Sequence, residues 1–335
     1  MKRILVGVIA TGLLLSLPAL GQKQFKLTNT VKLGGDGGWD YLTFDKDSQR
    51  LFITRGTHVM VVDAKTLKQV GDIPDLSGIH GVALAPGLNK GFVSNGGDDT
   101  ISVFDLKTLQ VTDKIKVGGR PDAILFEPYS KHVFTFNAKS QDSTVVDAAS
   151  GKVVATIPLG GKPEFPASDG KGKLFVNIED KGEIAAVDVS TNSVLAHWPM
   201  PGCEEPSALA MDAAHNRLFS GCGNKTMAVT DASSGSRVAM VPIGAGVDAG
   251  AFNPNTQQIF MSCGEGTLAV IHQETPDKYS VVQSVSTVRG ARTMALDPDT
   301  NTVYLVTAQF GQKGPNDRRP PIIPNTFELL VVKPE

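Results

Sequence analysis

Short apolar stretches alternate with polar turns along most of the chain. In one typical segment, "HGVALAP", "GFVSN" and "TISVFDL" follow one another within residues 80–106 and are separated by turn residues such as Gly, Asn and Asp. Apolar runs this short, bounded by turn residues, predict β-strands rather than helices. The 35 glycines of the chain, spread along its length, favour the same all-β interpretation.

The strand pattern repeats at a nearly constant interval. Each repeat has one aromatic residue in its second predicted strand, and successive aromatics are 40, 42, 41, 44, 41 and 44 residues apart. These aromatics are Phe52, Phe92, Phe134, Phe175, Phe219, Phe260 and Tyr304. A period of 40–45 residues with several short strands per unit is typical of propeller blades. The sequence therefore predicts a seven-bladed β-propeller of four-stranded antiparallel blades.

The last repeat lacks a fourth strand, because the chain ends at "FELLVVKPE". The segment "FKLTNTVKLGG" at residues 25–35 mirrors "LQVTDKIKVGG" at residues 109–119, which holds the fourth strand of its own repeat. We therefore expect the N-terminal strand to complete the last blade and close the ring, which removes exposed sheet edges. Residues 22–335 then form a single seven-bladed propeller domain.

A second position also repeats, in phrases such as "VVDAKT" and "VFDLKT". It holds Asp63, Asp105, Asp147, Asp188 and Asp231, with His272 in the sixth repeat. Aspartate and threonine in such turns bond nearby backbone N–H groups. We interpret these aspartates as turn residues, since catalysis would not require one in each blade. His272 predicts a different turn in its blade.

The predicted second strands "GFVSNG", "VFTFNA", "LFVNIE" and "VYLVTA", with junctions such as "VGGRPDAILFEP", resemble the YVTN-repeat (YncE-like) β-propeller family of exported bacterial proteins. The resemblance covers residues 24–335. It implies the propeller fold and export, and it does not imply an activity. The fifth and sixth repeats depart from the pattern, with "LFSGCG" and "IFMSCG".

The first 21 residues have the pattern of a secretory signal peptide: a basic start, an apolar stretch and small residues before Gln22. We expect a periplasmic or extracellular protein whose mature chain has no membrane span; an uncleaved anchor is the alternative. The formal net charge of the whole chain is −2, and no stripe of Lys and Arg occurs. We therefore expect no nucleic-acid partner, and we expect a monomer.

One polar residue per repeat falls where the innermost strand of its blade begins, at the mouth of the central channel. These residues are Asp40, His80, Asp122, Glu164, Ser207, Asp248 and Arg292. Three interpretations remain open: a solvated polar funnel, a ligand-binding mouth, or a divalent cation site of His80 with Asp40 or Asp122. Trp39 either adds an aromatic wall to the mouth or packs between blades.

The three cysteines lie in the fifth and sixth repeats. Cys203 and Cys222 belong to the same blade and project to the same face, so we expect a disulfide between them. Cys222 and Cys263 hold equivalent positions on neighbouring blades, which separates them too widely for a bridge. We interpret Cys263 as a small buried residue.

A proline-rich segment, "GQKGPNDRRPPIIPN" at residues 311–325, interrupts the last repeat between its second and third strands. It is too long for a hairpin turn, and its prolines predict a mobile or polyproline-like excursion. It carries Lys313, Arg318 and Arg319 to the same face as the acidic mouth. It either folds over the channel, offers a segment to a partner, or is a tolerated insertion.

Two classes of function fit these features. The first is a non-catalytic binding or scaffold protein, whose loop-rich face around the channel takes a small ligand or a protein partner. The alternative is an enzyme (a hydrolase, a lyase or an oxidoreductase accessory), with or without the help of a metal ion, that uses His80 as base and Arg292 as anion anchor. The sequence has no nucleophile–base motif, which favours the first class. It identifies no cofactor, and a divalent cation is the one candidate.

Overall fold

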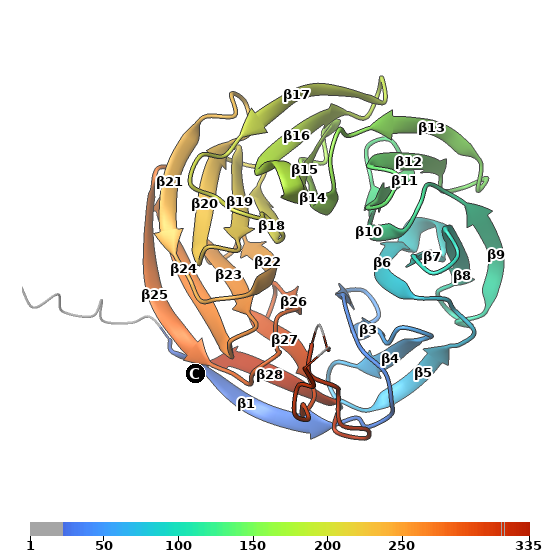
Figure 1. The fold of residues 1–335 in the computed structure, drawn as a ribbon, viewed down its shortest axis with the longest axis vertical. Coiled ribbons are helices and arrows are strands. Elements are labelled where there is room, and N and C mark those ends of the chain that lie inside the picture. The colour runs from blue at the N-terminus through green and yellow to red at the C-terminus, as the bar shows by residue number, and fades with distance from the viewer. Residues whose placement is uncertain (1–22, 316, 318) are drawn as a thin grey trace, which may run out of the picture.

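The structure is a computed structural model that describes residues 23–315, 317 and 319–335. Within these residues, 28 strands form seven four-stranded antiparallel sheets. The sheets stand around a central axis like the blades of a propeller (Figure 1). The predicted all-β, seven-bladed fold is confirmed.

Each blade runs from an inner strand beside the channel to an outer strand at the rim. Blade 1 is β2 (Leu42–Asp45), β3 (Arg50–Thr54), β4 (Val59–Asp63) and β5 (Gln69–Ile73). Blade 2 is β6 (Ile79–Ala85), β7 (Lys90–Asn95), β8 (Thr100–Asp105) and β9 (Val111–Lys116). Blade 3 is β10 (Pro121–Glu127), β11 (His132–Asn137), β12 (Asp142–Asp147) and β13 (Val153–Pro158). Blade 4 is β14 (Pro163–Ser168), β15 (Lys173–Ile178), β16 (Glu183–Asp188) and β17 (Ser193–Pro199).

The remaining blades follow the same order. Blade 5 is β18 (Leu209–Asp212), β19 (Arg217–Cys222), β20 (Thr226–Asp231) and β21 (Arg237–Pro242). Blade 6 is β22 (Val247–Asn253), β23 (Gln258–Cys263), β24 (Thr267–Thr275) and β25 (Lys278–Ser286). Blade 7 is β26 (Met294–Asp297), β27 (Thr302–Thr307), β28 (Glu328–Pro334) and β1 (Phe25–Lys32). Two single-turn 3₁₀ helices, Pro86–Leu88 and Glu179–Lys181, occur in loops.

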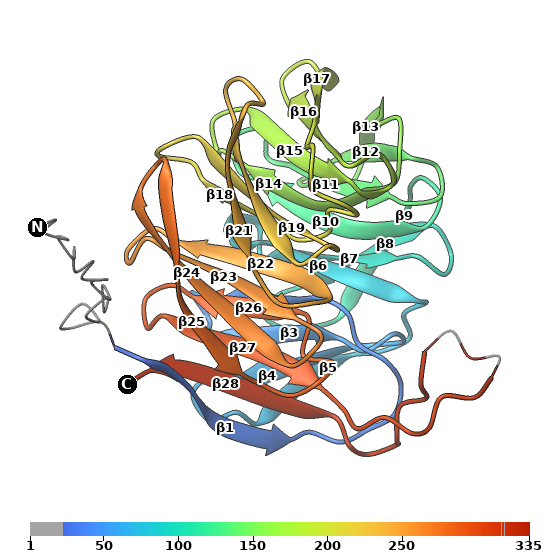
Figure 2. The ribbon, with the colours of Figure 1, turned by 60° about the vertical axis from the view of Figure 1, so that its left-hand side comes forward.

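Strand β1 closes the ring, as the sequence predicted. It pairs antiparallel with β28 along its length, from Phe25 opposite Pro334 to Lys32 opposite Glu328 (Figure 2). The Phe25 side chain is buried and meets the ring of Phe260 edge-on at 5.3 Å. The first and last strands of the domain therefore share one sheet, and β1 covers the edge that β28 would otherwise expose.

The repeated aromatic residues belong to the hydrophobic core. All seven are buried, and they sit in the apolar layers between neighbouring blades. Phe52 of blade 1, for example, packs against Phe104 of blade 2 with 5.8 Å between ring centroids. Burying one such side chain contributes about 1.5–3 kcal/mol, and the repeat supplies one in every blade.

The repeated aspartates stabilise turns between the third and outer strands. Asp63 accepts the Thr66 N–H at 2.7 Å, and Asp147 accepts both the N–H and the hydroxyl of Ser150 at 2.7 and 2.6 Å. These hydrogen bonds lower the pKa of both carboxyl groups. In the sixth blade His272 instead lies inside the longer strand β24, opposite Ser280, so the strand pairing extends past the usual turn.

The predicted signal peptide, residues 1–21, lies outside the described residues. In the part of the chain that the structure describes, no helix is both long enough and apolar enough to cross a membrane.

Candidate functional site

The seven predicted channel residues line one cavity. It has a volume of about 420 Å³ and lies on the face where the inner strands begin. We call it the mouth cavity. Its walls contain the predicted Asp40, His80, Asp122, Glu164, Ser207, Asp248 and Arg292, and also Tyr41, Arg120, Lys162, Phe165, Glu179 and Arg319.

The backbone directs these side chains into the mouth cavity in two ways. In blades 2, 3, 4 and 6 the polar residue lies at a bulge near the start of the inner strand, where the pairing register shifts. Those residues are His80, Asp122, Glu164 and Asp248. In the other blades, Asp40, Ser207 and Arg292 precede the inner strand by two residues. A β-bulge redirects a side chain out of the regular alternation, so the irregular backbone aims these groups at the axis.

Hydroxyl groups from second strands fix this backbone across blade boundaries. Ser94 of blade 2 donates to the carbonyl of Asp122 in blade 3, and Ser262 of blade 6 donates to the carbonyl of Arg292 in blade 7, both at 2.5 Å. Each bond ties a channel residue to the neighbouring blade, so the wall of the mouth cavity is preorganised.

Two aromatic rings close the apolar side of the mouth cavity. Tyr41 of blade 1 and Phe165 of blade 4 stack with 4.5 Å between centroids and 27° between ring planes. Blades 1 and 4 stand on opposite sides of the channel (Figure 1), so the stacked pair spans it. Burial, and then the nearby carboxylates, raise the pKa of Tyr41 well above its usual value. The phenol therefore stays neutral.

His80 lies between two carboxylates. Its Nδ1 is 2.6 Å from Oδ2 of Asp40 and 3.4 Å from Oδ1 of Asp122. One ligand atom from each of the three residues lies within 4.8 Å of the other two. Burial opposes a charged imidazole, but the hydrogen bond that His80 donates to Asp40 and the charges of Asp122 and Asp40 outweigh it, so the pKa of His80 is raised.

The other mouth carboxylates are crowded as well. Burial, and then the charge of Asp122, raise the pKa of Glu164 to about 8, although Lys162 Nζ lies 2.7 Å from its Oε1. Lys162 also pairs with Glu179. Burial raises the pKa of Asp248 to about 6 against the attraction of Arg292, whose Nε is 2.8 Å from Oδ2 of Asp248.

Arg292 and Ser207 contribute differently. The second contact of Arg292 reaches Oδ1 of Asp40 at 3.9 Å, so its guanidinium links two blades of the wall. Ser207 is buried, and its hydroxyl donates to the carbonyl of Val247 at 2.9 Å. That bond leaves only the acceptor capacity of the hydroxyl for a ligand.

Trp39 lies beside the mouth cavity rather than in its wall. Its ring packs at 6.0 Å from Phe310 and 5.6 Å from Phe327, both from the segment between β27 and β28. It thus packs between blades 1 and 7 and also lines a second, smaller cavity.

Several mouth residues were not identified from the sequence. Arg120 and Lys162 carry a signal that was available: the parallel phrases "GGRPD" and "GGKPE" place a basic residue two positions before Asp122 and Glu164. Tyr41 and Phe165 directly follow Asp40 and Glu164, so counting along the repeats also places them at the mouth, but it does not show that their rings meet. Glu179 had no such signal.

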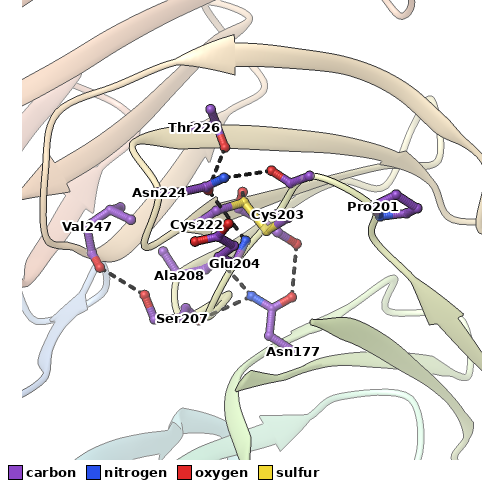
Figure 3. Close-up of a disulfide and its surroundings, with 12 residues drawn as sticks. Asn177, Pro201, Cys203, Glu204, Ser207, Ala208, Cys222, Asn224, Thr226 and Val247 are labelled. Carbon is purple, nitrogen blue, oxygen red and sulfur yellow. Dashed lines mark hydrogen bonds between the residues drawn. A yellow bond between two sulfur atoms is a disulfide. The ribbon is translucent and has the colours of Figure 1, made fainter. Parts of the chain in front are cut away.

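A disulfide lies on the same face. Cys203 and Cys222 are bonded, with 5.2 Å between their Cα atoms (Figure 3). The bond ties the loop that leads to Ser207 onto strand β19. Asn177 strengthens the same corner by donating to the carbonyls of Ser207 and Ala208 at 3.2 and 2.8 Å. Cys263 is a buried free thiol, and burial raises its pKa to about 11.

The proline-rich segment has a paired base. Phe310 bridges Ile322, the Gly311 N–H donates to the Pro321 carbonyl at 2.8 Å, and the Asn325 N–H donates to the Gly35 carbonyl at 3.2 Å. The described part of the segment is therefore anchored at its ends, while its loop projects from the ring (Figure 2). Arg319 lines the mouth cavity, and Arg318 lies outside the described residues.

Known proteins share this fold. Hydrazine synthase from Kuenenia stuttgartiensis matches with a TM-score of 0.70 and 18% identity, over 80% of this chain and 92% of that one. A chain of the mitotic checkpoint complex matches with a TM-score of 0.73 and 13% identity, over 91% and 95%. U3-55K matches with a TM-score of 0.76 and 11% identity, over 92% and 99%. Identities this low show the fold alone.

Sequence comparison matches part of the chain to one family. No curated protein matches the chain. Residues 40–171 match the model of the YNCE-like beta-propeller family. This match lies within the seven-bladed ring and supports the resemblance of the repeats to the YncE-like β-propellers.

Proposed function

We propose that this propeller is a non-catalytic binding protein whose mouth cavity takes a small cation. The ligand chemistry is a compact positive charge, supplied either by a divalent metal ion or by an organic ammonium group. Propellers commonly act as binding platforms, and the central channel is a natural place for a small ligand.

The convergence of Asp40, His80 and Asp122 carries this proposal. Three ligand atoms of mixed oxygen and nitrogen type within 4.8 Å of one another suit several divalent cations. A metal ion would take the place of the proton that the imidazole holds between the two carboxylates, so binding would release a proton.

The crowding of the mouth carboxyl groups supports the same ligand. Five carboxylates line the mouth cavity beside His80 and four Lys or Arg residues. The raised pKa values of Asp122, Glu164 and Asp248 mean that burial and mutual repulsion disfavour the ionised groups. An added positive charge relieves that repulsion.

The surroundings of His80 favour binding over general-base catalysis. A base must be neutral at working pH, whereas the carboxylates beside Nδ1 favour the imidazolium. The structure gives Arg292 two carboxylate contacts, which reduces its value as an anion anchor. We therefore place the enzyme hypothesis second.

We also propose that the protein works outside the cytoplasm. The signal-peptide pattern supports this location, and so does the disulfide of Cys203 and Cys222, since disulfides persist in oxidising compartments. The compartment is tested by fractionating cells of the source organism. A protein found only in the cytoplasm would contradict the proposal.

The binding proposal is tested by calorimetric titration of the disulfide-intact protein, freed of metal with a chelator and dialysed. Mn²⁺, Ca²⁺ and ethylammonium are titrated separately at pH 8. We expect saturable binding in at least one arm: the metal arms report an ion site, and the ethylammonium arm reports an organic cation site.

The variant Asp122→Asn should weaken that binding at least about tenfold, because it removes one full charge next to the ligand. Asp113→Asn, on the outer strand β9, removes the same charge away from the cavity and serves as the matched control. Absence of binding in all three arms, or equal binding by both variants, would reject the proposed function.

A further inference from the structure

A second cavity lies beside the mouth cavity, under the proline-rich segment. It has a volume of about 290 Å³ and shares Arg292 and Arg319 with the mouth cavity. We call it the side pocket. Its apolar wall includes Trp39, Phe310 and Ile322, and Arg289, Arg292 and Arg319 also line it.

The apolar wall is held in place by packing. The Phe310 ring lies against the backbone of Gly290, where a Cβ atom would come within 2.7 Å of the ring. Gly290 also has a φ of +89°, which side chains rarely adopt, so glycine serves both needs. The bridge from Phe310 to Ile322 then sets both apolar residues on the same side of the pocket.

Trp39 is positioned by a buried arginine. Arg55 donates to the carbonyls of Gly34, Asp36 and Gly38 at 3.2, 2.9 and 3.2 Å, and its guanidinium lies 3.6 Å from the centre of the Phe327 ring. These bonds fix the loop that ends at Trp39. The indole is therefore a rigid wall and needs no rearrangement to receive a flat ligand.

The charge at the side pocket is positive. Arg292 is paired with Asp248, but no carboxylate among the described residues lies within ion-pair distance of Arg289. Arg319 is exposed, and its positive charge acts on Asp248 across the shared wall. Apolar surface next to guanidinium groups matches a ligand with a flat apolar body and a negative end.

We infer that the side pocket binds a small planar organic anion, of the class of aromatic carboxylates. The ring lies against Trp39 and Phe310, and the carboxylate meets Arg289 and Arg319. The inference goes beyond the cation site of the mouth cavity and does not depend on it, because the two cavities have opposite charge preference and different apolar content.

The probe is benzoate, observed by fluorine NMR of protein labelled with 5-fluorotryptophan. The chain has two tryptophans, Trp39 in the pocket and Trp198, which stacks on Phe175 in blade 4. The variants Trp39→Phe and Trp198→Phe assign the two resonances. Benzoate should shift the Trp39 resonance saturably and leave that of Trp198 unchanged.

The role of charge is tested on the protein and on the ligand separately. The double variant Arg289→Gln/Arg319→Gln should weaken benzoate binding at least about tenfold, while Lys65→Gln/Lys107→Gln, at turns of the opposite face, should not. Benzyl alcohol, which keeps the ring and lacks the charge, should bind more weakly than benzoate by a similar factor.

Three results would overturn the inference: no saturable shift at Trp39, equal affinity for benzyl alcohol and benzoate, or no loss of affinity in the arginine double variant. Since Arg292 is left intact and the probe is an anion, failure here is distinguishable from failure of the cation titration.

Discussion

The molecule carries two sets of carboxyl groups, each repeated around the ring, and their pKa values shift in opposite directions. The turn aspartates, such as Asp63 and Asp147, accept backbone and hydroxyl hydrogen bonds, which lower their pKa. The mouth carboxyls Asp122, Glu164 and Asp248 are buried beside one another, which raises theirs. Hydrogen bonds that satisfy a carboxylate stabilise the blade, whereas crowding leaves carboxylates ready for a cation.

Among the tests of this comparison, we expect the largest effect on folding stability at Glu164. Its pKa is about 8 in the folded protein and near 4.5 as a free side chain, so folding stability falls as pH rises from about 4.5 to 8 and stays reduced above. Glu164→Gln removes this cost and should raise the unfolding free energy at pH 9 by roughly 1–3 kcal/mol.

Urea unfolding at pH 4 and pH 9 measures this difference. At pH 4 the two proteins should have nearly equal stability, because Glu164 is protonated in both the folded and the unfolded state. A variant less stable than the parent at pH 9 would show that the pair with Lys162 outweighs the crowding.

The next effect concerns cation affinity. Ionisation of Glu164 adds a negative charge to the mouth cavity, so affinity for ethylammonium or a divalent ion should rise by about tenfold from pH 7 to pH 9. In Glu164→Gln the rise should be largely lost. If the cation affinity of the parent protein did not change between pH 7 and pH 9, the crowding of Glu164 would have no bearing on cation binding.

Removal of a turn carboxyl should have the opposite consequence. Asp147→Ala deletes the bonds from the N–H and hydroxyl of Ser150 and should lower the unfolding free energy by about 1 kcal/mol at pH 7, with no change in cation affinity. The loss should shrink at low pH, because the lowered pKa of Asp147 means its stabilising charge disappears on protonation. Thermal unfolding with parallel calorimetry checks both halves of this prediction.

The smallest effect is expected in the sixth blade. His272 occupies the repeated position but lies within strand β24, so His272→Asp cannot form the usual turn. We expect a stability change within about 0.5 kcal/mol. If His272→Asp raised the unfolding free energy by as much as Asp147→Ala lowers it, aspartate would stabilise this repeat position even without the usual turn.

The sequence by itself determined the ring, its closure and the positions of the channel residues. The same apolar pattern recurs in every blade, so an aromatic residue such as Phe52 or Phe134 identifies the second strand of its own blade. Alignment of the repeats on these aromatics then shows that Asp40 and His80 occupy equivalent positions. The phrases around Arg120 and Lys162 held similar information. These features are local and periodic, which is why a pattern of about 40 residues is enough to predict them.

Only the tertiary structure decided what these residues do to one another. The stack of Tyr41 on Phe165 joins blades 1 and 4, and the side pocket joins Trp39 to Phe310 from the far end of the chain. Likewise, the position of His80 between Asp40 and Asp122 sets its pKa, which no spacing in the sequence expresses. The reason is physical: a repeat specifies a blade, but distances across the channel depend on the closed ring, where burial and charge act through space.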